Sequence, residues 1–230
     1  MDPKILTKIN EARLNRIACV HVTNLVDGRD RAVIAGNNVS GELGDAIDKS
    51  FKSGKSQTVE VSGEEFFINV HLPAPRIVVI GAVHISQALS KICEVAYFDL
   101  EVIDPRTAFA SQQRFGDACL YADWPEDVLK QHPLDAHCAL VAVTHDPKID
   151  DYPIKAALDA NCFYVGALGS RKTHAKRIAR LSQLGVSQDD LAKIHSPIGL
   201  DIGAATPQEI AVAIMAEIID VLRKREFSEG

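Results

Sequence analysis

The sequence shows none of the cysteine or histidine spacings that hold zinc or a disulfide framework. Its five cysteines are scattered over 230 residues, and no two of them form a C-x-x-C pair. His132, His137, Cys138 and His145 are near one another in the sequence, but their spacing fits no zinc site. An odd number of widely spaced cysteines indicates a protein of a reducing compartment, in which the cysteines serve mostly as small core residues. We therefore expect a cytoplasmic protein with no metal site.

The sequence also lacks a long, uninterrupted apolar run. Its most apolar stretch, residues 210–222, contains Glu217 and Asp220 and is shorter than the ~20 residues that cross a bilayer. Residues 1–16 carry charges without the apolar core of a signal peptide. No membrane span is predicted.

Acidic residues outnumber basic residues in this chain. The chain has 25 Lys and Arg against 31 Asp and Glu, which gives a net charge of −6 at pH 7. Affinity for phosphate backbones comes largely from Lys and Arg, so nucleic acid is not expected as a partner. No Ser-His-Asp or Cys-His pattern is recognisable either, so no catalytic residue is assigned.

The expected helices and strands follow two different patterns, one before and one after a short connector. Residues 1–72 alternate helical and hairpin-like segments, which predicts a small α+β domain. Pro73-Ala74-Pro75 follows, and two prolines in three residues favour an extended connector, so residues 73–230 form the second predicted domain. The elements expected in the first domain are helices at 4–14 and 43–51 and strands at 17–26, 32–35, 58–61 and 66–72.

The second region alternates apolar strands with helical segments, which is typical of a parallel sheet covered by helices. This predicts an α/β fold, a Rossmann-like doubly wound parallel sheet with its ligand site at the carboxyl ends of the strands. Thr206-Pro207-Gln208-Glu209 has the pattern of a capping box and starts a final, largely apolar helix. The expected strands are 77–80, 98–103, 138–143 and 163–167, and the expected helices are 84–94, 125–131, 151–160, 171–184 and 187–193.

The first strand of this region runs into the segment GAVHIS, residues 81–86, which begins like a dinucleotide-binding turn. Such a turn has the pattern G-x-G-x-x-G, and Val83 and Ser86 stand here at the second and third glycine positions. These two residues weaken the case for NAD(P). Asp104 nevertheless ends the next strand, where an acid holds a ribose hydroxyl, and Arg106 is placed to meet a phosphate. The alternative is that Asp104 and Arg106 only form the turn after the strand.

Polar residues also follow the first and third strands at the expected ligand edge. His84 lies in the first turn of a helix, where an imidazole is favoured in its neutral form. Thr144, His145 and Asp146 end the third strand. The alternatives are that His84 is a surface residue without a role and that the other three form a helix cap before Pro147.

Two further loops are candidate ligand contacts. Gly169, Ser170, Arg171 and Lys172 precede or open a helix, and their N–H groups, hydroxyl and two cations favour an anion. Helix capping by Ser170 is the alternative there. Residues 198–203 hold an acid between two glycines, and such a loop can pass close to a ligand, although the acid can instead pin its own loop. The residues of interest in this second loop are Gly199, Asp201 and Gly203.

The segments THDPKID, YVGALGSRKTHAKRIARL and IHSPIGLDIGAATPQEIAVAIMAEII resemble the xanthine dehydrogenase accessory protein family (XdhC/CoxI). The resemblance covers residues 76–225. It implies a chaperone that binds molybdenum cofactor, promotes its sulfuration and delivers it to a xanthine dehydrogenase-type molybdenum hydroxylase, with a sulfur-donating desulfurase as a second partner. The cofactor carries a phosphate or pyrophosphate, which gives the predicted anion-binding loops a ligand. All the candidate residues named above fall within segments that resemble the family's motifs.

Two departures from the family pattern leave alternatives open. The loop after the first strand reads Gly-Ala-Gly-His in the family and has Val83 in the middle here. The family's Ser-Gly-Gly-Cys segment is Ser40-Gly41-Glu42-Leu43 in this chain, without the thiol that would handle sulfur. An NAD(P)-dependent oxidoreductase and a ligand-free interaction module that kept the fold are therefore the alternatives. A homodimer is expected in any of these cases, because the apolar final helix needs cover.

Overall fold

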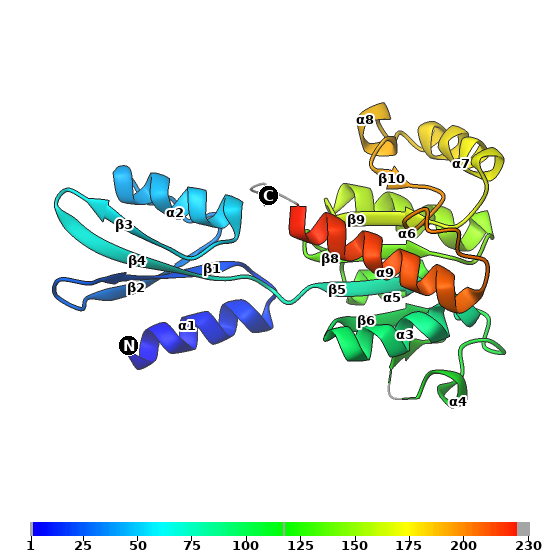
Figure 1. Ribbon diagram of the computed structural model, residues 1–230, viewed down its shortest axis with the longest axis horizontal. Coiled ribbons are helices and arrows are strands. Elements are labelled where there is room, and N and C mark those ends of the chain that lie inside the picture. Colours follow the sequence, from blue (N-terminus) through cyan, green and yellow to red (C-terminus); the bar gives the residue numbers. More distant parts are fainter. Residues whose placement is uncertain (1, 117, 225–230) are drawn as a thin grey trace. The chain divides into compact units, whose positions relative to one another are not determined.

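The computed structural model describes residues 2–116 and 118–224. The chain divides into two compact units, which meet in the sequence between residues 74 and 75. Figure 1 labels most elements of both units.

The first unit is an antiparallel sheet with one helix on each face. The strand order is β2-β1-β4-β3. Val20 and Val22 of β1 pack with Ile47 of α2 on one face, whereas Cys19 packs with Ile9 of α1 on the other. The alternation of side chains along β1 therefore supplies two separate cores. The elements are α1 (Pro3–Leu14), β1 (Cys19–Asn24), β2 (Asp30–Ile34), α2 (Glu42–Ser53), β3 (Gln57–Val61) and β4 (Glu64–His71).

The second unit contains a parallel sheet of six strands in the order β10-β9-β8-β5-β6-β7. Helices cover both faces of this sheet (Figure 1), which confirms the predicted Rossmann-like doubly wound fold. Its strands are β5 (Arg76–Ile80), β6 (Asp99–Ile103), β7 (Cys119–Tyr121), β8 (Cys138–Ala142), β9 (Tyr164–Ala167) and β10 (Ile194–His195). Its helices are α3 (His84–Ala96), α4 (Gln112–Phe115), α5 (Pro125–Gln131), α6 (Pro147–Asp159), α7 (Arg171–Gln183), α8 (Gln188–Leu191) and α9 (Pro207–Lys224).

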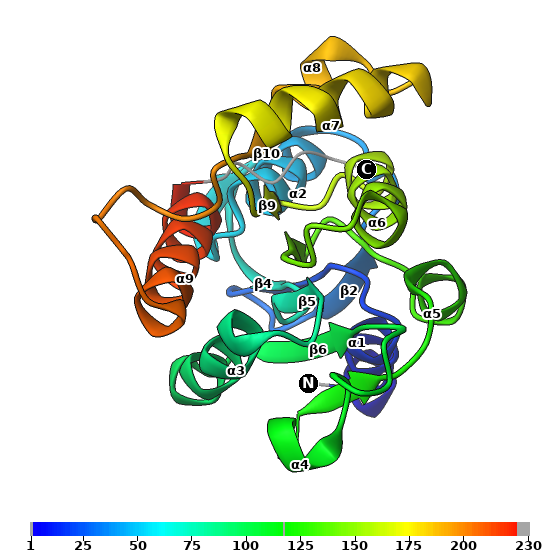
Figure 2. The same cartoon turned by 90° about the vertical axis from the view of Figure 1, so that its right-hand side faces the viewer.

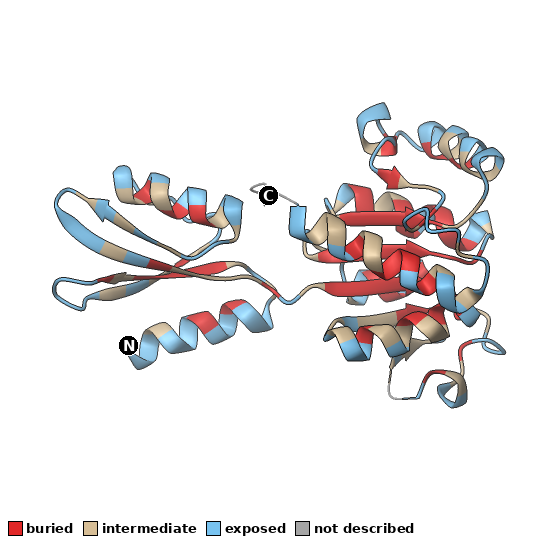
Figure 3. Cartoon of the chain, in the orientation of Figure 1, coloured by how far each residue is buried: buried red, intermediate tan, exposed pale blue. Residues whose placement is uncertain are grey.

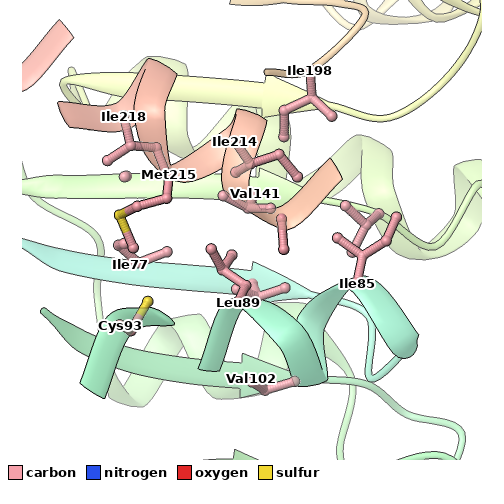
Figure 4. Packing of buried hydrophobic residues seen from close by; sticks show 14 of the residues in the cluster. Ile77, Ile85, Leu89, Cys93, Val102, Val141, Ile198, Ile214, Met215 and Ile218 are labelled. Atoms are coloured by element: carbon pink, nitrogen blue, oxygen red, sulfur yellow. The ribbon is translucent and has the colours of Figure 1, made fainter. Parts of the chain in front are cut away.

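Both faces of the central strands are apolar and buried (Figure 3). In β5, Ile77 and Val79 face a cluster that includes Leu89 of α3 and Ile214 of α9 (Figure 4). The alternate residues Val78 and Ile80 face the second cluster, which α5, α6 and α7 cover. This arrangement explains why the strands read as continuous apolar runs.

The order of the strands places a switch point between β5 and β8. The chain leaves β5 to form β6 and β7 on one side and then returns to place β8 on the other side of β5. The loops after β5 and β8 therefore diverge, and ligands of doubly wound sheets bind at such a point. Figure 2 shows the second unit with the layer of α3 and α9 on one side of the strands and that of α5 and α6 on the other.

The helix boundaries follow local capping signals. Glu209 accepts hydrogen bonds from the N–H groups of Ala205 and Thr206, at 2.8 and 2.9 Å, which confirms the predicted capping box of α9. Helix α6 begins at Pro147 rather than at residue 151, because Asp146 caps it by accepting the Lys148 N–H at 3.0 Å. The short elements α4, β7 and β10 were not predicted, since runs of two to four residues carry no periodic signal.

Candidate functional site

Gly81 is required by the close approach of the loops after β5 and β8. Its φ is +116°, and a Cβ there would lie 2.8 Å from Thr144 Cγ2 and 3.3 Å from the Thr144 nitrogen. The fully buried Ser86 donates its hydroxyl to the carbonyl oxygen of Gly81. Ser86 therefore closes the turn from the position where a dinucleotide-binding loop has its third glycine.

Val83 and His84, in the same loop, have different surroundings. Val83 precedes α3 in extended backbone, and its side chain is half-buried against the core beneath α3 and α9. His84 is the first residue of α3 and is exposed, and it borders a shallow pocket of about 440 Å³ with Lys91 and Arg114. Val83 thus contributes to packing as well as occupying a glycine position.

Asp104 ties the loop after β6 to the loop after β5. Its fully buried carboxylate accepts the Ala82 N–H at 2.8 Å and the Arg106 N–H at 2.9 Å. The Arg106 guanidinium adds two bonds, of 2.9 and 2.7 Å, one to each oxygen. Burial raises the pKa of Asp104, but these bonds outweigh it, and the pKa lies below its ordinary value. The ribose role of Asp104 stays a prediction.

Thr144, His145 and Asp146 form the turn from β8 into α6. The Thr144 hydroxyl donates to Asp150 Oδ1 at 2.7 Å and accepts the Asp146 N–H at 3.0 Å. His145 is exposed and has a left-handed backbone, with φ of +64°. Asp146 and Thr144 therefore have capping and turn-forming bonds, as the alternative interpretation of this segment predicted.

Asp150 is the titratable group at this edge that sequence reasoning missed. It lies one turn into α6 and is 2% exposed. Burial raises the pKa of its carboxyl to about 6, against the lowering effects of the Thr144 hydroxyl and Arg177. Perturbed carboxyls of this kind are enriched at functional sites. An acid in the first turn of a helix looked unremarkable in the sequence, because such acids usually face solvent.

A pocket of about 240 Å³ lies between α6 and α7. Asp150, Asp151 and Arg177 contribute to its wall. Asp151 is held by Arg180 through two bonds, of 2.5 and 2.9 Å. The full lining is His145, Pro147, Asp150, Asp151, Lys172, Thr173, Lys176, Arg177 and Arg180.

The loop after β9 leads into α7, and the first turn of α7 borders this pocket. Gly169 has φ of +141°, and a Cβ there would lie 3.1 Å from Thr173 Cβ. Ser170 caps α7 by accepting the Thr173 N–H at 3.3 Å. Arg171 is exposed, and the following residue, Lys172, borders the pocket instead. Of the two cations predicted for this loop, Lys172 borders the pocket and Arg171 does not.

The loop of residues 198–203 is fastened to α9. A Cβ on Gly199 would lie 3.0 Å from backbone atoms of Ala213 and Ile214. The Gly199 N–H donates to Glu217 at 2.8 Å, and Glu217 also accepts the Tyr164 hydroxyl at 2.6 Å. Asp201 and Gly203 are exposed on the same loop. Gly199 is therefore needed for packing against α9, and Glu217, which sequence reasoning assigned to no site, holds the loop.

The structure gathers the candidates into three groups. The first, at the switch point, contains Gly81, Asp104, Arg106, Thr144 and Asp146. The bonds to Asp104 raise the pKa of Arg106, and the charges of Asp146 and Asp150 raise it further. The second group, Gly169, Ser170 and Arg171, follows β9 and directly precedes Lys172, which borders the α6–α7 pocket, as does His145. The third group is the loop on α9, and His84 borders the separate pocket with Lys91 and Arg114.

Within residues 2–116 and 118–224, no cluster of three His, Cys, Asp or Glu side chains is suited to a metal ion. No helix of that part is both long and apolar enough to cross a membrane.

The fold and this edge define a Rossmann-like domain with its candidate site at the switch point of a doubly wound sheet. A family model described as the XdhC Rossmann domain matches residues 77–218. The chain therefore belongs to the XdhC family, as its sequence motifs predicted.

Three curated proteins are similar to about two-thirds of the chain. The uncharacterized protein YqeB of Escherichia coli K12 is 30% identical over 67% of this chain and 29% of its own length. A probable xanthine dehydrogenase subunit of Bacillus subtilis 168 is 34% identical over 69% of this chain and 46% of its own length. The molybdenum cofactor insertion chaperone PaoD of E. coli K12 is 27% identical over 67% of this chain and 42% of its own length. The matches thus span less than half the length of each relative.

A solved structure shares the fold. A crystal structure of a xanthine dehydrogenase from Bacillus halodurans superposes with a TM-score of 0.70 at 23% sequence identity. The match covers 96% of this chain and 67% of that one, so both units of this chain have counterparts there.

Proposed function

We propose that this chain is an accessory protein that binds molybdenum cofactor and assists its maturation and its insertion into a xanthine dehydrogenase-type molybdenum hydroxylase. The observation that carries the proposal is the similarity to PaoD, which is named a molybdenum cofactor insertion chaperone, over 67% of the chain. The relative named as a probable xanthine dehydrogenase subunit supports the same setting. On this proposal the chain is a cytoplasmic carrier and not a metabolic enzyme, and residues 1–72 form a separate small domain.

The chemistry of the candidate edge is compatible with a phosphorylated ligand. Lys172 and Lys176 border the α6–α7 pocket, and the buried Arg177 lines the same pocket. Cations in a partly desolvated setting are what a phosphate group requires. On this proposal the chain recognises the organic part of the cofactor, whose phosphate or pyrophosphate would meet this edge.

The proposed partners are a molybdenum hydroxylase, a sulfur-donating desulfurase and a second copy of the chain. Most of the apolar face of α9 is already covered, since Ala211, Ile214 and Ile218 are buried in the core. Val212 and Ile219 remain 51% and 36% exposed on the same helix. These two side chains are where the proposal places a homodimer contact.

The second candidate function, an NAD(P)-dependent oxidoreductase, has less support from the site. Val83 is half-buried where a glycine would let the backbone approach a pyrophosphate. The Asp104 carboxylate is fully buried and bound by Ala82 and Arg106, so a ribose hydroxyl would have to displace one of these donors.

The test is cofactor carriage. The chain is expressed in a host that makes molybdenum cofactor and purified without oxygen, and released pterin is oxidised and quantified by fluorescence. We expect near-stoichiometric pterin. Pterin-free protein with a native circular dichroism spectrum would overturn the proposal, and titration with NAD and NADP would then test the second candidate.

Matched glycine substitutions locate the carriage site. Gly81→Ala drives the loops after β5 and β8 apart, because its Cβ would lie 2.8 Å from Thr144 Cγ2. Gly185→Ala is the control, since Gly185 also has a positive φ, +83°, but no atom stands within 4 Å of its added Cβ. We expect pterin content to fall in Gly81→Ala and to persist in Gly185→Ala.

A further inference from the structure

The guanidinium of Arg177 is buried with an incomplete set of partners. Arg177 is 2% exposed, and its Nη2 donates to the Leu168 carbonyl oxygen at 2.9 Å. Its Nε and Nη1 are also buried and have no hydrogen-bond partner among the described residues. Leaving a buried charged donor unsatisfied is costly, and native proteins seldom do so without a reason.

The carboxylates nearby do not account for these two nitrogens. Asp151 is engaged by Arg180, and Asp150 accepts the Thr144 hydroxyl. Both acids act on Arg177 only through space, and burial pulls the pKa of Arg177 below its ordinary value despite their charges. The guanidinium is thus a desolvated cation with two donors to spare.

The pocket that Arg177 lines is suited in size and charge to one small anion. Its volume of about 240 Å³ is below the ~300 Å³ at which pockets for drug-sized ligands begin. Lys172, Lys176 and Arg180 also line it, against Asp150 and Asp151, so cations outnumber carboxylates. Thr173 adds a hydroxyl to the lining. A tetrahedral oxyanion in this pocket would lie beside the charge of Arg177 and accept hydrogen bonds from the rim ammonium groups. The buried Nε and Nη1 donors would join these contacts once the guanidinium turns toward the anion.

We propose that the pocket between α6 and α7 is a binding site for a phosphate or pyrophosphate group, with Arg177 as its buried anchor and Lys172 and Lys176 at its rim. The site is defined by side chains of two helices and differs from the backbone cradle of a dinucleotide turn, which this chain has lost at Val83. It does not depend on which molecule carries the phosphate, so it can stand or fall separately from the cofactor role.

The experiment is isothermal titration calorimetry of the full chain with inorganic pyrophosphate as the probe. We expect saturable binding of one anion per chain, with the dissociation constant at least tenfold higher in Arg177→Gln. Lys193→Gln is the matched control, because Lys193 is an exposed cation of the same unit outside the pocket, and it should leave the affinity unchanged. Absence of saturable heat, or equal affinity in Arg177→Gln and the unaltered chain, would overturn the proposal.

Two further arms keep the test decisive. If circular dichroism shows that Arg177→Gln does not fold, the double variant Lys172→Gln/Lys176→Gln decides, since both side chains are exposed. That variant should bind pyrophosphate several-fold more weakly, and an unchanged affinity would refute the site. Inorganic phosphate and a nucleoside diphosphate, titrated in parallel, distinguish a site for the free anion from one for a phosphate carried on a larger ligand.

Discussion

Replacing Asp150 by asparagine should stabilise the second unit at neutral pH. The Asp150 carboxyl is 2% exposed, and burial raises its pKa from 3.8 to about 6. Each pKa unit corresponds to about 1.4 kcal/mol, so ionisation of Asp150 costs the folded state on the order of 3 kcal/mol. The asparagine side chain would retain an oxygen that can accept the Thr144 hydroxyl, now 2.7 Å from Asp150 Oδ1. The substitution therefore removes the buried charge and keeps the bond.

The sign of the pH dependence follows from the direction of the shift. Between pH 3.8 and about 6 the folded state holds a proton on Asp150 that the unfolded chain has lost. The stability contributed by this group is therefore present below pH 3.8 and is lost as the pH rises through about 6. We expect the Asp150→Asn variant and the unaltered chain to be about equally stable at pH 4 and to differ by about 3 kcal/mol at pH 7.5.

Urea unfolding followed by the fluorescence of Trp124 measures this difference. Trp124 is the single tryptophan of the chain and precedes α5, so its signal reports on the second unit rather than on the first. Asp159→Asn is the control, because this carboxylate ends the same helix with a 61% exposed side chain. It should shift the stability by less than about 0.5 kcal/mol at every pH.

A destabilised Asp150→Asn chain at pH 7.5 would refute the reasoning. It would mean that the cations around Asp150 more than compensate the cost of burying its charge. The groups that act on Asp150 are Thr144 and Asp151 on its own segment and helix, Arg106 after β6, and Arg177 and Arg180 on α7.

Other features of the second unit, and the pocket that Asp150 lines, lead to four more expected outcomes. Glu217→Gln should lower the stability of this unit by about 1–3 kcal/mol above pH 4.5, measured by urea unfolding. The loss should be smaller in acid, because the hydrogen bonds to Glu217 outweigh its burial and hold its pKa below 4.5, so the native carboxylate itself loses its stabilising effect as the pH falls. Asp104→Asn should cost about 3 kcal/mol in the same assay, since it breaks the ion pair between the fully buried Asp104 carboxylate and the partly exposed Arg106. Val83→Gly should not create NAD affinity in calorimetry, because Asp104 remains engaged by Arg106; micromolar binding would contradict this. Sulfate, whose charge is constant between pH 5 and 7.5, should bind several-fold more tightly at pH 5, and Asp150→Asn should reduce that difference, leaving the part contributed by His145 of the same pocket.

The fold was predictable because its signals are local and repeated. The strands of the second unit are apolar on both faces, and the start of α9 is marked by Thr206 and Glu209, which bond each other's backbone N–H groups as expected. The weak point was the beginning of α6, where Asp146 and Pro147 start a helix that continues through Pro153. Two prolines in such a short segment favour a later start, but the first occupies the first helical position, where no N–H is needed.

The candidate site was predictable only as an edge of the sheet. Gly81, Thr144 and Gly169 were placed there because the carboxyl ends of parallel strands meet at one edge. Asp150 and Arg177 could not be found in the same way, since each lies within a polar stretch of a helix and resembles a solvent-exposed residue. Their burial results from the packing of α6 on α7, which is a tertiary contact and leaves no mark on sequence spacing.

The segment GAVHIS is therefore better explained as a closed turn than as a degraded fingerprint. Gly81 lacks a side chain because Thr144 occupies the space, and Ser86 supplies a hydroxyl that the Gly81 carbonyl accepts. Asp104 then bonds the Ala82 N–H, so the first backbone donor that could face a pyrophosphate is already engaged. A loop built in this way has few groups left for a nucleotide, whereas Arg177, beyond β9, has two donors without partners among the described residues. The balance of satisfied and unsatisfied groups thus moves the anion site from the turn after β5 to the pocket between α6 and α7.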